Sequence, residues 1–112
     1  MDCIFCKIAA GEIPSKKAYE DEKILAFYDI APQAPVHILV IPKEHIAGVD
    51  EVAEDNAKVV AHIFTKIPEI AKAAGLSDGF RVVSNVGKHG CQSVRHLHFH
   101  LLGGAQLSEK MS

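Results

Sequence analysis

The sequence predicts an α+β protein with a five-stranded antiparallel sheet, one long helix and a short N-terminal helix. Five short segments are rich in β-branched and aromatic residues and are bounded by glycine, proline or charged turns, as strands are. One longer segment has apolar residues at the spacing of an amphipathic helix. Strands and helices do not alternate regularly, so a parallel βαβ arrangement is not expected.

The first half of the chain is expected to contain the short helix and three strands. In residues 3–12, Ile4, Phe5 and Ile8 are at helical spacing, and Gly11 supplies an end signal. Residues 15–20 and 24–30 are predicted strands on either side of the charged turn EDEK. Two prolines make residues 31–35 a loop. The segment VHILVI at 36–41 is a strand that Pro42 ends.

The longest helical pattern covers residues 52–74, with an acidic first turn in DEVAED and Gly75 as its end signal. Its apolar stripe consists of Val60, Ile63, Phe64, Ile67, Ala71 and Ala74. Pro68 interrupts the pattern, and proline inside a helix costs about 3 kcal/mol and usually bends the axis. One bent helix is therefore expected, with two helices as the alternative. Residues 80–85 and 94–102 are the last two strands, joined by the loop VGKHGCQS.

Length and composition limit the class of protein. With 112 residues, 48% hydrophobic and 23% charged, the chain fits one globular domain over 1–112. A formal net charge of −2 gives no basic excess of the kind that nucleic-acid binders show, and no apolar run is long enough to cross a membrane. MDCIFCKI lacks the layout of a signal peptide. A cytoplasmic location is expected, where the three cysteines would be reduced thiols.

Three histidines at alternate positions, His96, His98 and His100, are the most unusual feature of the sequence. In a strand over 94–102 they would share one face, with Leu97 and Phe99 on the other. A solvated polar face is one interpretation, and two others are functional. Neutral imidazoles two residues apart can chelate a metal. A row of them can also supply a nucleophile with positive neighbours for chemistry on an anion.

The loop before the histidines favours chemistry on an anion. NVGKHGCQSV offers glycine-spaced backbone amides and the side chains of Asn85, Gln92 and Ser93. These groups are suitable hydrogen-bond donors to a phosphate or another oxyanion. Most glycine-containing loops are simple turns, so the loop gains weight only because it directly precedes the three histidines.

The segment H-L-H-F-H-L-L resembles the signature of the histidine triad (HIT) superfamily, His-x-His-x-His followed by apolar residues. Further segments follow in the order typical of its Hint branch: C-I-F-C-K-I, G-E-I-P, Y-E-D, A-F-Y-D-I-A-P-Q-A-P, H-I-L-V-I-P-K-E-H-I and C-Q-S-V. The likeness covers about residues 3–104. It implies a HIT-like fold, a two-fold homodimer with a continuous ten-stranded sheet, and a purine nucleotide substrate. The implied reaction is hydrolysis of the P–N bond of adenosine 5′-phosphoramidates.

The resemblance also implies roles for individual residues. His98 would attack the α-phosphorus and form a nucleotidyl-histidine, with a backbone carbonyl expected to hold the proton on its other ring nitrogen. His100 and His37 would help to bind phosphate and set the environment of His98. Ser93 and Asn85 would contact the phosphate, and Ser93 would also contact the leaving amine.

Nucleoside recognition is implied in the same way. Asp29 would accept hydrogen bonds from the ribose hydroxyls. An apolar slot for the base would be formed by Phe5, Ile8, Phe27 and Ile30. Composition alone allows other roles, because Asp29 can be a turn residue, and Phe27 and Ile30 can be simple core.

Cys3 and Cys6 form a C-x-x-C motif, which by itself is ambiguous among zinc binding, redox chemistry and chance. A thioredoxin-like motif would need a βαβ context, which the predicted order lacks. HIT proteins that carry this pair resemble zinc proteins in which two histidines complete the site. The matching positions here are His45 and His96, which would give a closed, tetrahedral structural site.

Two residues depart from the family pattern. Cys91 stands where Hint-like sequences usually have glycine, and a side chain is awkward there if the position needs a positive φ. Arg95 stands where an aromatic residue is common, and the tail after Gly104 is short. Two rival functions stay open: hydrolysis of dinucleoside polyphosphates, and nucleotide binding or protein interaction with weak activity. The Ser93 loop favours phosphoramidates over the first, and an intact His98 argues against the second.

Overall fold

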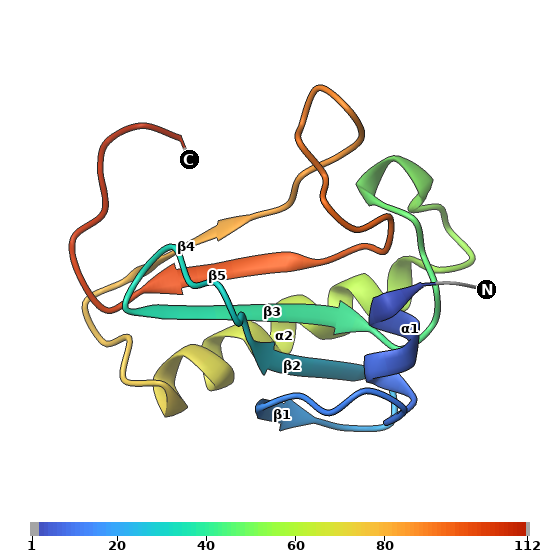
Figure 1. Ribbon diagram of the computed structural model, residues 1–112, viewed down its shortest axis with the longest axis horizontal. Helices are drawn as coiled ribbons and strands as arrows, with labels where there is room; N and C mark the ends of the chain where they lie inside the picture. The colour runs from blue at the N-terminus through green and yellow to red at the C-terminus, as the bar shows by residue number, and fades with distance from the viewer. Residues whose placement is uncertain (1–2, 112) are drawn as a thin grey trace.

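The computed structural model describes residues 3–111, which form one antiparallel sheet with two α-helices (Figure 1). The elements in chain order are α1 (Ile4–Ala9), β1 (Lys17–Glu20), β2 (Ile24–Tyr28), β3 (Val36–Pro42), the 3₁₀ helix η1 (Val49–Glu51), α2 (Ala57–Ala73), β4 (Phe80–Val83) and β5 (Phe99–Gly103). The strand order is β1-β2-β3-β5-β4, and each neighbouring pair is antiparallel. The predicted α+β class, with five antiparallel strands and one long helix, is confirmed.

Helix α2 covers one face of the sheet, behind it in Figure 1. Ile63 and Ile67 of the predicted apolar stripe, together with Ile70, pack in one cluster with residues such as Ile38 and Leu101 from the strands. Each fully buried isoleucine contributes about 1.5–3 kcal/mol, so this layer supplies much of the stability. Neither helix among residues 3–111 is long and apolar enough to cross a membrane.

The opposite face of the sheet is only partly covered, by α1 at one end (Figure 1). Phe5 and Ile8 of α1 pack there with strand residues that include Phe27 and Leu39. The register places Leu39 opposite His100 in the β3–β5 pair. Because side chains alternate along a strand, His100 is on the α1 side while its buried neighbour Phe99 faces α2. The uncovered part of this face is where the functional side chains lie.

The predicted strand over 94–102 is wrong in its first half, because β5 begins only at Phe99. The preceding segment makes other hydrogen bonds: Leu97 N donates to Ile46 O at 2.6 Å, and His96 N donates to Val94 O at 2.8 Å. His96 is therefore outside the strand, as is His98, and the three histidines do not share a strand face. This removes the constraint that His96 must point the same way as His98.

The long helix also differs from the prediction at its start. It begins at Ala57 rather than 52, because the acidic segment forms η1 and a turn closed by Asn56, whose Oδ1 accepts from Ala53 N at 2.7 Å. The helix continues through Pro68, which is exposed, so the two-helix alternative is wrong. The remaining elements are found where predicted, most of them a few residues shorter at their ends.

Candidate active site and metal centre

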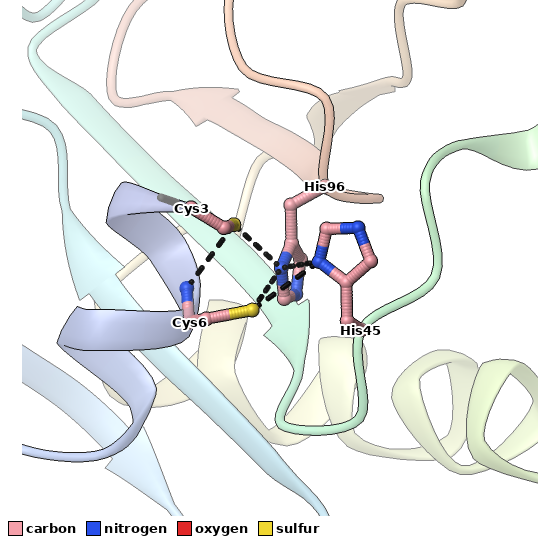
Figure 2. A group of neighbouring side chains, drawn as sticks. All are labelled: Cys3, Cys6, His45 and His96. Carbon is pink, nitrogen blue, oxygen red and sulfur yellow. Dashed lines mark hydrogen bonds between the residues drawn. The ribbon is translucent and has the colours of Figure 1, made fainter. Parts of the chain in front are cut away.

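Four side chains from three parts of the chain meet beside α1 (Figure 2). Cys3 is the N-cap of α1, and its Sγ accepts from Cys6 N at 3.3 Å, which places the two thiols one turn apart. His45 comes from the loop after β3, and His96 comes from the segment before β5. The structure therefore brings together the four residues of the predicted metal site.

The four ligand atoms have the spacing of a four-coordinate ion. Cys6 Sγ is 3.2 Å from His45 Nδ1 and 3.5 Å from His96 Nδ1. Cys3 Sγ is 3.3 Å from His96 Nδ1, and the two Nδ1 atoms are 3.2 Å apart. A tetrahedral zinc ion with bonds of about 2.0–2.3 Å would hold such atoms roughly 3.3–3.8 Å apart. The cluster fits one ion after small movements of the side chains.

The surroundings of the cluster also suit a metal. His96 is fully buried, and its Nε2–H donates to Pro42 O at 2.8 Å, so the lone pair of a neutral ring is on Nδ1, inside the cluster. Burial, together with the neighbouring Cys3 thiol, raises the pKa of Cys6 to about 11. The Cys6 thiol is therefore protonated at neutral pH unless a cation displaces the proton, as a bound metal does.

His96 also acts on His98 through its main chain. His98 Nδ1 lies 2.7 Å from the carbonyl oxygen of His96. A carbonyl can only accept, so the proton of a neutral His98 is on Nδ1 and the lone pair is on Nε2. Burial lowers the pKa of His98, which keeps the ring neutral. The expected backbone contact to this histidine is present, and the ring has the tautomer that a nitrogen nucleophile needs.

A second chain of hydrogen bonds sets the tautomer of His100. The backbone N–H of Gln33 donates to His37 Nδ1 at 3.0 Å, so a neutral His37 carries its proton on Nε2. That nitrogen lies 2.9 Å from His100 Nδ1, to which it donates. His100 in turn keeps its proton on Nε2. The two triad rings therefore differ: His98 has a free acceptor nitrogen at Nε2, whereas His100 has an N–H donor there.

Asp29, His37 and His100 could in principle hold a second metal, because one ligand atom from each lies within 4.8 Å of the others. The hydrogen bonds argue against this interpretation. Gln33 N–H occupies His37 Nδ1, so His37 Nε2 keeps a proton and has no lone pair for a metal. Asp29 Oδ2 lies 3.5 Å from that same nitrogen. His37 and His100 form a hydrogen-bonded relay, and the Asp29 carboxylate lies beside it.

An apolar slot of about 520 Å³ lies between α1 and the triad. Eight residues predicted for the site line it: Phe5, Ile8, Phe27, Asp29, Ile30, Ser93, His98 and His100. Sequence reasoning missed the other lining residues, which are Ile4, Ile13, Pro14, Ser15, Lys16, Tyr28, Leu39 and Val94. Three of them, Ile4, Tyr28 and Val94, are chain neighbours of predicted residues, so adjacency was a signal for these three. A flat apolar group with a polar tail fits the shape and chemistry of this slot.

The sequence left alternative roles open for three slot residues, and the structure gives a different answer for each. Phe27 is both core and slot, since it is buried in the α1-side cluster and lines the cavity. Ile30 is fully exposed at the slot, so the simple-core interpretation of it is wrong. Asp29 is a turn residue as well as a lining residue, because its Oδ1 accepts from Ala31 N at 2.8 Å.

Three predicted site residues do not line the slot. His37 lies beside it, in contact with His100. The Nδ2 of Asn85 donates to Gly90 O at 2.7 Å, which braces the phosphate loop, residues 86–93. The side chain of Gln92 bonds to the main chain on either side of the same loop. The amides of Asn85 and Gln92 therefore hold the loop in shape in this structure.

The phosphate loop contains an unusual backbone. Cys91 has φ +59°, the one positive φ of a non-glycine residue among residues 3–111. The position therefore does need the left-handed conformation, which costs a residue with a side chain about 1–2 kcal/mol. Gly90 before it is required for a different reason: a Cβ there would overlap the main chain of Val86. The loop is tightly wound, with backbone amides in successive turns.

Comparisons with known proteins agree with this architecture. A family model described as "Scavenger mRNA decapping enzyme C-term binding" matches residues 2–112. The structure of a HIT family hydrolase from Clostridium thermocellum superposes with a TM-score of 0.95 at 46% identity, covering 99% of this chain and 97% of that chain. The likeness thus extends over nearly the full length of both chains.

Two relatives bear on the site. A "14 kDa zinc-binding protein" of Zea mays is 50% identical over 107 residues, 94% of this chain and 84% of the maize protein. The "Adenylylsulfatase HINT1" of Arabidopsis thaliana is 47% identical over 107 residues, 94% of this chain and 73% of that protein. One name describes a metal and the other a reaction.

The buried relay predicts a pH dependence of stability. Burial, with the His98 and His37 imidazoles nearby, lowers the pKa of His100 to about 4 from an ordinary 6.5, while Asp29 opposes the shift. The unfolded chain then takes up a proton first, so stability is full above about pH 6.5 and falls as the pH drops toward 4. Replacing His100→Gln should make the fall of Tm over this range shallower.

The matched control is His89→Gln, an exposed histidine of the phosphate loop. Thermal melts of wild type and both variants in the same buffers between pH 4 and 7 give the comparison. Because each variant is compared with wild type, the contribution of the other histidines to the change of Tm with pH cancels. Equal slopes for wild type and His100→Gln would contradict the prediction.

Proposed function

This chain belongs to the histidine triad family, and on that premise we propose that it hydrolyses the P–N bond of adenosine 5′-phosphoramidates through a nucleotidyl-histidine on His98. Membership makes it a HIT family hydrolase, and the hydrolase names among its relatives support a nucleotide substrate. One observation carries the proposal: the carbonyl of His96 holds the proton of His98 on Nδ1, which leaves Nε2 as a nucleophile at the slot.

The reaction would have two steps. The Nε2 lone pair of His98 attacks the α-phosphorus, a P–N bond to the histidine forms, and the bond from phosphorus to the amine breaks. The departing nitrogen must gain a proton, and the Ser93 hydroxyl and the Nε2–H of His100 are the donors at the slot. Water then attacks the same phosphorus and passes a proton to the group that protonated the amine. The bond from phosphorus to His98 breaks, AMP leaves, and both side chains return to their starting forms.

The slot would bind the nucleoside. Phe5, Ile8 and Phe27 offer an apolar surface for a purine. The ribose hydroxyls would donate to Asp29, whose Oδ2 is not used by the turn that occupies Oδ1. Since Oδ2 also lies 3.5 Å from His37 Nε2, ribose binding and the His37–His100 relay would share one carboxylate.

The cluster of Cys3, Cys6, His45 and His96 is proposed to hold a single zinc ion. Such an ion would be structural, because four protein ligands leave no open position for substrate. It would tie the N-terminus of α1 to the loop after β3 and to the segment before His98. The name of the maize relative and the ligand spacing support this assignment.

A homodimer is also proposed, formed through β4, which is an edge strand of the sheet. Phe80 and Val82 of β4 are 42% and 37% exposed, and Phe64 of α2 is 49% exposed. Val82 is paired with Leu101, whose side chain faces α2, so these apolar side chains are on the same side of the sheet. Pairing two β4 edges would bury them and remove an unpaired strand edge.

The first prediction concerns the nucleophile. His98→Asn removes the attacking nitrogen but keeps a polar side chain, so kcat should fall by at least about 10³-fold while AMP still binds. Mass spectrometry of enzyme quenched with an AMP–amine phosphoramidate should find an AMP adduct on His98 in wild type and none in the variant. His89→Asn, in the exposed part of the phosphate loop, is the matched control.

The same assay discriminates among substrates. A panel of an AMP–amine phosphoramidate, a diadenosine polyphosphate and adenosine 5′-phosphosulfate separates P–N cleavage from the two P–O alternatives. The last compound is included because one relative is named an adenylylsulfatase. An adduct on His96 or His100, or nearly normal turnover by His98→Asn, would refute the assignment.

The second prediction concerns zinc. Protein purified without chelator should contain about one zinc per chain, as a single closed site requires. Cys6→Ser should lose most of this metal and lower Tm, because it removes a ligand. Cys91→Ser should keep it, because Cys91 is exposed and outside the cluster. Metal analysis by plasma mass spectrometry decides, and zinc-free wild type would rule out the proposal.

The third prediction concerns assembly. Light scattering should report about twice the 12.1 kDa mass of the chain. Val82→Lys places a charge at the β4 edge and should shift the protein toward monomer. Val49→Lys makes the same change at an apolar residue that is 45% exposed on η1, and it should leave the mass unchanged. A monomeric wild type at micromolar concentration would count against the dimer.

A further inference from the structure

The side-chain amide of Gln92 uses all of its hydrogen-bonding capacity. Its Nε2 donates to Ala47 O at 2.8 Å and to Val94 O at 2.9 Å. Its Oε1 accepts from Gly87 N at 2.9 Å and from Arg95 Nη1 at 2.7 Å. An amide has two N–H donors and two acceptor lone pairs, so nothing is left over. The orientation of the amide is also fixed, because the two N–H donors face Oε1 and the two carbonyl acceptors face Nε2.

These four bonds join three parts of the site. Ala47 is two residues beyond His45 in the metal-cluster loop, residues 43–48. Gly87 is near the start of the phosphate loop. Val94 leads into the histidine triad, and its carbonyl also accepts from His96 N at 2.8 Å. The Gln92 amide is therefore a cross-link between the loop that supplies one metal ligand and the loop that precedes the nucleophile.

An ion pair on the outside holds the amide in place. Arg95 Nη2 donates to Asp50 Oδ2 at 2.8 Å, and the two side chains are 45% and 48% exposed. A pair this exposed contributes only about 0–1 kcal/mol by itself. Its consequence is geometric, because it aims the other guanidinium nitrogen at Gln92 Oε1. Gly48 makes room for it, since a Cβ there would be 2.6 Å from Arg95 Nη1.

We propose that Gln92 is a positioning residue that locks the phosphate loop to the metal-cluster loop and so fixes Ser93 relative to His98. Ser93 follows Gln92 directly and lines the slot, whereas Gln92 does not line it. His98 is oriented by the carbonyl of His96, whose N–H is held by Val94 O. One amide thus acts on both groups without touching substrate.

A direct role for Gln92 as a phosphate donor would require its amide to break its hydrogen bonds to Ala47 O and Val94 O. Giving up two well-formed hydrogen bonds in a half-buried site is unfavourable, so the amide is better used where it is. The two roles also differ in what they do to the free protein. A phosphate ligand matters only when nucleotide is bound, while a cross-link stiffens both loops in its absence.

The test is Gln92→Glu, which has the same size but places an oxygen against the carbonyls of Ala47 and Val94. Hydrogen exchange measured without nucleotide should rise by about tenfold or more in residues 45–51 and 86–95, and stay unchanged in α2. A misplacement of about 1 Å can lower turnover by about 10²-fold, so kcat should fall much more than KM rises. Gln106→Glu, an exposed glutamine with the same charge change, is the control and should match wild type.

Two further variants keep the test decisive. Gln92→Met removes the same bonds without adding charge and replaces Gln92→Glu if that protein does not fold. Arg95→Met removes one bond of the four and should have a smaller effect on both measurements. Exchange rates in Gln92→Glu or Gln92→Met equal to those of Gln106→Glu would overturn the proposal. Weaker AMP binding with unchanged exchange would also overturn it, in favour of a phosphate ligand.

The turnover measurement rests on the proposed function, but the exchange measurement does not. If wild type hydrolyses none of the three nucleotide substrates, the proposed function fails. Faster exchange in both loops would then still support the cross-link, and unchanged exchange would still refute it.

Discussion

The site depends on one fully buried histidine, His96, which is held by its side chain and its main chain at once. Its Nε2–H bonds to Pro42 O, and its Nδ1 faces the two thiols and His45. Its carbonyl oxygen then selects the tautomer of His98. A histidine without the first contact could rotate its ring, and its carbonyl would be less fixed. The geometry of the cluster therefore affects the orientation of the proposed nucleophile His98, which is only two residues away.

The His98–His100 pair shows how neighbouring imidazoles can be chemically different. Both are neutral at pH 7, because burial lowers the pKa of each. The carbonyl next to His98 pushes its proton to Nδ1, whereas the donor His37 next to His100 pushes its proton to Nε2. At Nε2, His98 is therefore a hydrogen-bond acceptor, whereas His100 is a donor. Displacement at phosphorus uses both functions, a lone pair for attack and an N–H near the developing charge.

Much of the fold was predictable from the sequence. In central strands such as VHILVI and in the stripe of α2, the pattern of apolar residues matches the side chains that are buried. The approach to β5 was not, because His-Leu-His-Phe alternates like a strand while Leu97 bonds to the loop at Ile46. The alternation there reflects which side chains are buried and says nothing about backbone pairing. The metal cluster spans 93 residues between Cys3 and His96, so only the family resemblance suggested it. The role of Gln92 was invisible, since its partner Ala47 is 45 residues away.

The phosphate loop combines a strained residue with a dense set of restraints, and the two are connected. Cys91 is in a conformation that favours glycine, so the loop by itself would tend to relax to other shapes. Asn85 restrains the loop through Gly90 O, and Gln92 restrains it through Gly87 N. A loop with glycine at position 91 would need less restraint to reach the same shape. Arg95 adds a further restraint through its contact with the Gln92 amide, and we expect this contact to compensate for the side chain at Cys91. If so, the loss caused by Arg95→Met should be smaller in a protein that also carries Cys91→Gly, and a double-mutant cycle on thermal stability measures that coupling. Strictly additive effects would show that the two departures from the family pattern are independent.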